Sequence, residues 1–335
     1  MKFDFCIGNP PYQEETDSDS TRKPPVYNLF MEEAYKIADA VEMITPARFL
    51  FDAGYTPKAW NEKMLNDKHF KVGYYESDSS KIFRNTEIKG GIAISYRDVN
   101  KNYGSIGTFT KYPEVNDILK KVKAHCEHYM DEIIHSPLAF QLTDLMKKEH
   151  PNLLDRLRTS AFTNLSDIFY EKKPDDGNEY ISMIGLMNNR RTTRFVRRDY
   201  IKDSSGTLDR YTLLMPKASG SGTFGEQAGP TVIAEPGLAY TQTFISIGEF
   251  ENVVEAQNVQ KYIKTKFLRA MLSVLKITQD CPAPKWKWVP LQDFTFNSDI
   301  DWTKSINEID LQLYSKYGLT TREIDFIEQN VKEME

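Results

Sequence analysis

Apolar side chains recur at strand and helix spacings along the first hundred residues. Alternating or short apolar runs predict strands at residues 3–8, 41–46, 70–76, 92–97 and 105–110. Helical spacing predicts helices at about 27–38 and 58–66. Strands and helices that alternate in this way are typical of an α/β sheet, in which functional loops follow the strand ends.

The pattern changes after this region. Residues 112–158 are helical and charged, and we interpret them as a bridge between two domains. The remainder mixes strands, glycine turns and one long predicted helix at about 254–276, whose apolar stripe we assign to a core. Gly318 is expected to end one late helix, and Thr320 or Thr321 to cap the next. The predicted domains are therefore 1–111 and 159–335, joined by the bridge at 112–158.

Composition narrows the class of protein. The 335 residues are enough for two domains, and 40% hydrophobic with 27% charged residues is typical of globular proteins. We find no membrane-spanning run and no signal-peptide pattern, and the odd count of three distant cysteines favours a reducing cytoplasm. His125, Cys126 and His128 are more typical of a solvated helix face than of a metal site, so we predict no bound metal.

Charge is distributed unevenly, although the net charge of −5 does not favour nucleic acid. One basic stripe contains Arg190, Arg191, Arg194, Arg197, Arg198 and Lys202 against a single acid, Asp199. Such a stripe is typical of a phosphate-binding face, but a solvated edge strand also carries charge. The stripe alone leaves both interpretations open.

A rigid polar loop, Asn9-Pro10-Pro11-Tyr12, follows the first predicted strand. Each proline fixes its own φ and pushes the preceding residue into an extended conformation. The carbonyls of Asn9 and Pro10 can then face outward beside the Asn9 amide oxygen, and paired acceptors suit an NH2 group. Tyr12 offers a flat face for a planar ring. The four residues can also occur in an ordinary proline-rich turn, but the preceding strand makes that alternative weaker.

This loop, preceded by Phe3-Asp4-Phe5-Cys6-Ile7-Gly8, resembles the catalytic motif of adenine-N6 DNA methyltransferases of type II restriction–modification systems. The resemblance implies that Asn9 and the Pro10 carbonyl accept the amine hydrogens of a flipped adenine in double-stranded DNA. It implies stacking by Tyr12, stiffening by Pro11 and transfer of a methyl group from S-adenosylmethionine. Acceptors set in advance raise electron density on the attacking nitrogen. A later piece, residues 82–92, resembles the motif whose aromatic packs on the base, which assigns Phe83 to base stacking.

The second half resembles the target-recognition domain of the same enzymes. The matching pieces are residues 216–222, 241–248, 264–269, 288–294 and 313–328. The implied fold is α/β, with part of a Rossmann-like methyltransferase sheet followed by a mixed α+β target-recognition domain. The resemblance favours DNA contact by the basic stripe and by Lys217.

The family's cofactor site raises a difficulty, because its glycine-rich turn precedes the catalytic loop and only eight residues precede that loop here. Residues 220–225 fit G-x-G-x-x-G, but the β-like run from Thr231 leaves no room for the helix that a cofactor loop must open. We interpret this segment as a turn that touches DNA phosphate. We therefore expect the S-adenosylmethionine loop to be absent from this chain, which then binds the cofactor weakly or not at all. Either a separate subunit carries that half or the gene product is truncated.

Two other functions stay open. A DNA-binding specificity module without catalytic activity would retain the loop as a relic, and the expected lack of a cofactor half favours it. A nuclease is disfavoured, because Pro174-Asp175-Asp176 is not followed by a well-placed Glu-x-Lys.

Overall fold

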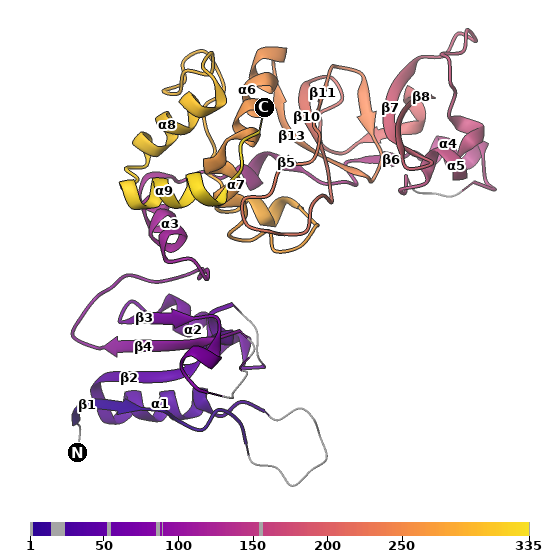
Figure 1. Ribbon diagram of the computed structural model, residues 1–335. Helices are drawn as coiled ribbons and strands as arrows, with labels where there is room; N and C mark the ends of the chain where they lie inside the picture. The colour runs from indigo at the N-terminus through magenta and orange to yellow at the C-terminus, as the bar shows by residue number, and fades with distance from the viewer. Residues whose placement is uncertain are drawn as a thin grey trace. The chain divides into compact units, whose positions relative to one another are not determined.

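The computed structural model describes residues 3–14, 24–51, 55–84, 88, 90–153 and 157–334 (Figure 1). The chain divides into two compact units, residues 1–116 and 117–335. The part of the expected bridge that follows residue 116 belongs to the second unit and contributes strands to it, so residues 112–158 do not form a separate helical bridge.

A four-stranded mixed sheet forms the centre of the first unit. Its strands are β1 (Phe3–Gly8), β2 (Ala38–Pro46), β3 (Phe70–Glu76) and β4 (Ile92–Asp98), in the order β1-β2-β4-β3. β1 pairs parallel with β2, whereas β4 runs antiparallel to β2 and β3. Its helices are α1 (Tyr27–Ile37) and α2 (Lys58–Asn66), with the 3₁₀ turns η1 (Ala47–Phe51) and η2 (Ser79–Lys81). The helices and strands predicted before residue 100 are confirmed, with small shifts at their ends.

The strand predicted at 105–110 is wrong. Gly104 and Gly107 both have positive φ, which breaks an extended strand. The N–H of Gly107 donates instead to the carbonyl of Leu65 at the end of α2 (2.7 Å). This segment is therefore held at the end of α2 and forms no strand of the sheet.

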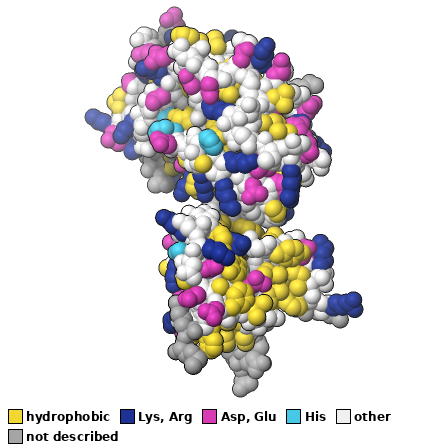
Figure 2. All heavy atoms as spheres, turned by 90° about the vertical axis from the view of Figure 1, so that its left-hand side faces the viewer, with side chains coloured by type: hydrophobic (Ala, Val, Ile, Leu, Met, Phe, Trp, Pro, Cys, Tyr) yellow, Lys and Arg dark blue, Asp and Glu magenta, His cyan; other side chains and the backbone are white. Residues whose placement is uncertain are grey.

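The two faces of this sheet differ. Both helices pack on one face, where Met31 and Ala34 of α1 and Trp60 and Met64 of α2 join one buried cluster with β2. The opposite face carries Phe3, Phe5 and Ile7 of β1, which are 53%, 50% and 70% exposed. Phe5 lies on this face beside Tyr96 of β4, with 6.3 Å between ring centres. Figure 2 shows apolar side chains, in yellow, gathered on the surface of the first unit.

The second unit contains several small sheets. One has the order β11-β10-β13-β5, from β11 (Val232–Ala234), β10 (Tyr211–Pro216), β13 (Phe244–Phe250) and β5 (Ile134–His135). Another has the order β12-β7-β8, from β12 (Leu238–Tyr240), β7 (Tyr180–Met187) and β8 (Arg190–Arg197), and β6 (Phe140–Leu142) pairs with β9 (Ile201–Asp203). The helices are α3 (Pro113–His125), which spans the boundary between the units, α4 (Asp144–Glu149), α5 (Ala161–Asn164), α6 (Val253–Lys264), α7 (Lys266–Leu272), α8 (Ile306–Lys316) and α9 (Thr321–Asn330). The 3₁₀ turns are η3 (Met130–Ile133), η4 (Ser166–Ile168), η5 (Arg198–Tyr200) and η6 (Ala283–Trp286).

The long helix predicted at 254–276 is two helices, α6 and α7, which meet at Thr265. Thr265 adopts an extended conformation (ψ 147°), and its side chain accepts a hydrogen bond from the N–H of Leu268. Asp310 of α8 accepts from the N–H groups of Lys266 and Phe267, at 2.9 Å each. These acceptors satisfy the free N–H groups at the start of a helix, so a new helix, α7, begins there.

The carboxyl-terminal helices agree with the sequence. Gly318 has φ 60° just after α8, and Thr320 caps α9 by accepting from the N–H of Glu323. The protein is therefore a mixed α/β protein with several sheets. Among the residues that the structure describes, no helix is long and apolar enough to cross a bilayer.

Candidate active site

The strand directions bring the candidate loops to one edge of the first sheet. β2 and β3 both run antiparallel to β4, and β1 runs parallel to β2. The carboxyl ends of β1, β2 and β3 therefore lie at the same edge of the sheet. The Asn9–Tyr12 loop follows β1, η1 follows β2, and η2 with Phe83 follows β3. Open α/β sheets bind their ligands at this edge.

The Asn9–Tyr12 loop is fixed by a hydrogen bond at Tyr12, whereas its first residue, Asn9, is exposed. Asn9 and Pro11 are exposed, Pro10 is buried and Tyr12 is half-buried. The carbonyl of Tyr12 accepts a hydrogen bond from the N–H of Val26 (3.2 Å), directly before α1. The Asn9 amide is therefore accessible to a ligand on a loop whose backbone is fixed by the start of a helix.

Tyr12 and Phe83 come together although they lie far apart in sequence. Their ring centres are 6.5 Å apart with an interplanar angle of 67°, an edge-to-face contact. Phe83 is positioned by a hydrogen bond from its N–H to the carbonyl of Ser79 (2.8 Å). Burial raises the pKa of the Tyr12 hydroxyl above its ordinary value. The hydroxyl is buried and has no partner among the described residues.

Gly91, directly before β4, fits closely against the same edge of the sheet. Gly91 has φ 80°, and a Cβ there would lie 2.3 Å from the carbonyl oxygen of Glu76. Its own carbonyl accepts from the N–H of Ala47 at the start of η1 (2.9 Å). This position requires glycine, because both the conformation and the space exclude a side chain.

Sequence reasoning missed two buried polar residues of this unit. Thr45 lies near the carboxyl end of β2, and Asn28 lies in the first turn of α1. Both are buried, and the Oγ1 of Thr45 and the Oδ1 of Asn28 have no hydrogen-bond partner among the described residues. A threonine before a proline and an asparagine in a first helical turn are too common to have identified them.

The predicted basic stripe is largely engaged in contacts within the protein. Arg194 pairs with Glu171 (2.9 Å), and Arg198 pairs with Asp209 (3.0 Å). Further contacts join Arg197 to Asp199 (2.6 Å) and Glu149 (3.1 Å), and Arg191 to the carbonyl of Pro230. Arg190 is exposed and has no side-chain partner among the described residues. Lys217 is half-buried, and its backbone bonds Thr243 and Cys281. The stripe is therefore not a row of free cations.

The G-x-G-x-x-G segment does not have the structure of a cofactor loop. No helix begins between Gly220 and Pro230, all of which the structure describes. The N–H groups of Ser221 and Gly222 donate to the carboxylate of Glu226, which also pairs with the buried Lys276. The segment's own acid thus occupies the position in which such amides would bind a phosphate.

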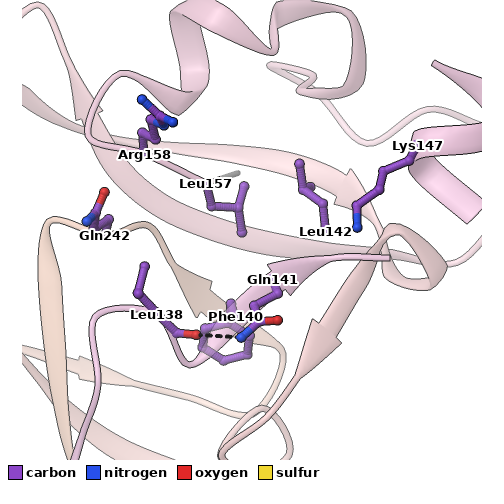
Figure 3. Close-up of a pocket in the computed structure, with 8 residues that line it drawn as sticks. All are labelled: Leu138, Phe140, Gln141, Leu142, Lys147, Leu157, Arg158 and Gln242. Carbon is purple, nitrogen blue, oxygen red and sulfur yellow. Dashed lines mark hydrogen bonds between the residues drawn. The ribbon is translucent and has the colours of Figure 1, made fainter. Parts of the chain in front are cut away.

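A separate cavity lies in the second unit (Figure 3). It has a volume of about 700 Å³ and is lined by Leu138, Phe140, Gln141, Leu142, Lys147, Leu157, Arg158 and Gln242. Apolar side chains form its centre, while Lys147 and Arg158 reach it from different elements. Residues that we predicted as catalytic do not contribute to it.

Comparison with known proteins agrees with the predicted resemblance. Residues 1–83 match the family model described as Eco57I restriction-modification methylase. A protein described as an uncharacterized adenine-specific methylase, from Mycoplasma pneumoniae, is 34% identical over 95 residues. That match covers 28% of this chain and 22% of the relative. The predicted resemblance to restriction–modification methylases is therefore confirmed over residues 1–83.

Two solved structures are also similar. The Type IIL restriction-modification enzyme MmeI, in complex with DNA, matches with a TM-score of 0.38 and 11% identity over 98% of this chain and 56% of that chain. The type IIG restriction endonuclease BpuSI matches with a TM-score of 0.31 and 10% identity over 92% of this chain and 50% of that chain. The chain therefore spans about a fifth of the curated relative and about half of these two proteins.

Proposed function

We propose that this chain is the catalytic and recognition portion of a cytoplasmic, site-specific DNA adenine-N6 methyltransferase. The observation that carries the proposal is the exposed Asn9 amide beside the contact of Tyr12 and Phe83, at the sheet edge where α/β proteins bind ligands. The family match over residues 1–83 supports the same chemistry.

In this proposal the loop binds an adenine that has left the duplex. The Asn9 oxygen and the Pro10 carbonyl accept the two amine hydrogens, which keeps electron density on the nitrogen as it becomes tetrahedral. Tyr12 stacks on the base, and Phe83 packs against it from a second side. Pro11 limits the freedom of the turn, so the acceptors need not reorganise during the reaction.

The methyl group would come from S-adenosylmethionine, but the glycine segment of this chain does not fit that cofactor, because Glu226 occupies its amides. We propose that a further polypeptide segment binds the cofactor and packs on the uncovered face of the first sheet. Parallel strands are normally covered on both faces, and the exposed side chains of Phe3, Phe5 and Ile7 fit a covering partner.

The test is methyl transfer from labelled S-adenosylmethionine to mixed-sequence DNA by this chain together with the polypeptide encoded beside it. We expect Asn9→Ala to lower the rate by about 10²- to 10³-fold, the usual effect of losing one preorganised hydrogen-bonding group. Gln13→Ala, an exposed change on the same loop, is the matched control and should retain full activity. An Asn9→Ala variant with unchanged activity would refute the assignment. DNA binding without methyl transfer by the wild-type pair would favour the specificity module.

A further inference from the structure

Two lysines of the second unit share one indole ring. Lys123 lies in the last turn of α3, and Lys287 directly follows η6. Their Nζ atoms lie 3.9 Å and 5.1 Å from the ring centre of Trp288. Trp288 is itself held edge-on against Tyr129, with 5.6 Å between ring centres. The ring is therefore a fixed platform that brings two positive charges together.

These two charges lack acidic partners in the described part of the chain. Lys123 is half-buried, and neither ammonium group forms an ion pair or hydrogen bond with a described residue. Burial, followed by repulsion from Lys287, lowers the pKa of Lys123 to about 8. Attraction between the ammonium groups and the face of the indole ring offsets part of the cost of burial and repulsion, but the ring does not neutralise the positive charge of the two lysines. An anion bound here would offset the repulsion between the two ammonium groups and the cost of burying Lys123.

Other cations of the second unit differ from these two lysines, because they form ion pairs within the protein. Arg194, Arg197 and Arg198 of the predicted stripe each pair with a carboxylate. A lysine in the last turn of a helix can also serve only the helix dipole. That role would account for Lys123, but it does not account for a second lysine on the same ring.

We propose that Lys123 and Lys287, held by Trp288, contact the phosphate backbone of DNA. This inference rests on the proposed function, in which the chain binds DNA. Lysine suits the role, because an ammonium group is a flexible point charge that needs no fixed geometry with a phosphate oxygen. Such contacts fix the position of the protein on the duplex without reading the sequence.

The salt dependence of DNA affinity tests the proposal. Binding of the full chain to a fluorescent mixed-sequence duplex is measured by anisotropy between about 50 and 200 mM salt, the range in which phosphate contacts are resolved. The slope of log affinity against log salt is negative, and each phosphate contact adds about 0.9 to its magnitude. Lys123→Met with Lys287→Met should therefore reduce the magnitude of the slope by nearly 2, and the affinity by about five-fold per lysine near 0.15 M salt. Lys287→Met alone, at an exposed position, should reduce the magnitude of the slope by about 0.9 without affecting folding.

The control is the pair Lys123→Arg with Lys287→Arg, which keeps both charges and should keep the wild-type slope. An unchanged slope in Lys287→Met and in the double methionine variant would overturn the inference and leave the proposed methyl transfer intact. Displacement of the duplex by polyglutamate as effectively as by unlabelled DNA would also overturn it, because an acidic peptide would then be the ligand. A wild-type chain without affinity for DNA would contradict the proposed function itself.

Discussion

At the residue scale, Tyr12 separates two possible contributions to the candidate site, its ring and its hydroxyl. The ring contacts Phe83, whereas the buried hydroxyl has no partner among the described residues. Tyr12→Phe should therefore retain activity within about three-fold, since no hydrogen bond is lost. Tyr12→Ala should lose activity by at least about tenfold, because stacking of a base on an aromatic ring is worth about 1–3 kcal/mol.

The measurement is kcat/KM for methyl transfer by the reconstituted enzyme, with thermal unfolding as the check on folding. A large loss in Tyr12→Phe would contradict this view and would assign the hydroxyl a direct role. Equal activity in Tyr12→Ala would instead remove Tyr12 from the base-binding site.

The sequence predicted the residues of the loop but not the state of the arginines. Asn9 to Tyr12 form a local motif directly after a strand, so their position at the sheet edge follows from the strand itself. Several partners of the arginines are remote in sequence, as Glu149 is from Arg197 and Glu171 is from Arg194. Charge density along a segment therefore cannot show which cations remain free for a ligand.

At the element scale, the glycine-rich segment at residues 220–225 packs closely against the backbone near Ile277. Gly222 has φ 85°, and a Cβ there would lie 2.1 Å from the carbonyl carbon of Ile277. Gly206 has a similar φ of 75° but no atom within 4 Å of the same position. The pair separates the effect of conformation from the effect of packing.

We expect Gly206→Ala to lower the free energy of unfolding by about 1–2 kcal/mol, the usual effect of a left-handed residue with a side chain. Gly222→Ala should cost more, by about a further 1–3 kcal/mol, because the backbone must also move apart. Urea unfolding followed by circular dichroism measures both variants. Equal losses in the two variants would show that the segment is loose enough to absorb the clash.

Elements with purely local signals were predicted well, and those that depend on tertiary contacts were not. The helix at 58–66 and the strand at 70–76 agree with α2 and β3. The break between α6 and α7 depends on Asp310, which lies in a helix far along the chain. Apolar periodicity continues through Thr265, so the pattern alone favoured a single helix.

At the scale of the whole molecule, the first unit has one covered and one uncovered sheet face. The covered face was predictable from helices that alternate with strands. The other face was not, because the more apolar side of β1 would be expected to meet the helices, whereas Cys6 packs against the helix-covered core and Phe5 and Ile7 are exposed. Phe5 and Ile7 are half or more exposed there, which is unusual for a strand that pairs in parallel.

This face gives the last prediction. Phe5→Ser with Ile7→Ser should weaken association of the chain with the cofactor-binding polypeptide by at least about tenfold, since each buried side chain contributes about 1.5–3 kcal/mol. The same variant should bind less of a dye specific for exposed apolar surface. Phe296→Ser is the matched control, because Phe296 is 95% exposed but belongs to the second unit. If the double variant associates as tightly as the wild type, the partner binds elsewhere, and the assignment of Asn9 is tested separately by the activity of Asn9→Ala.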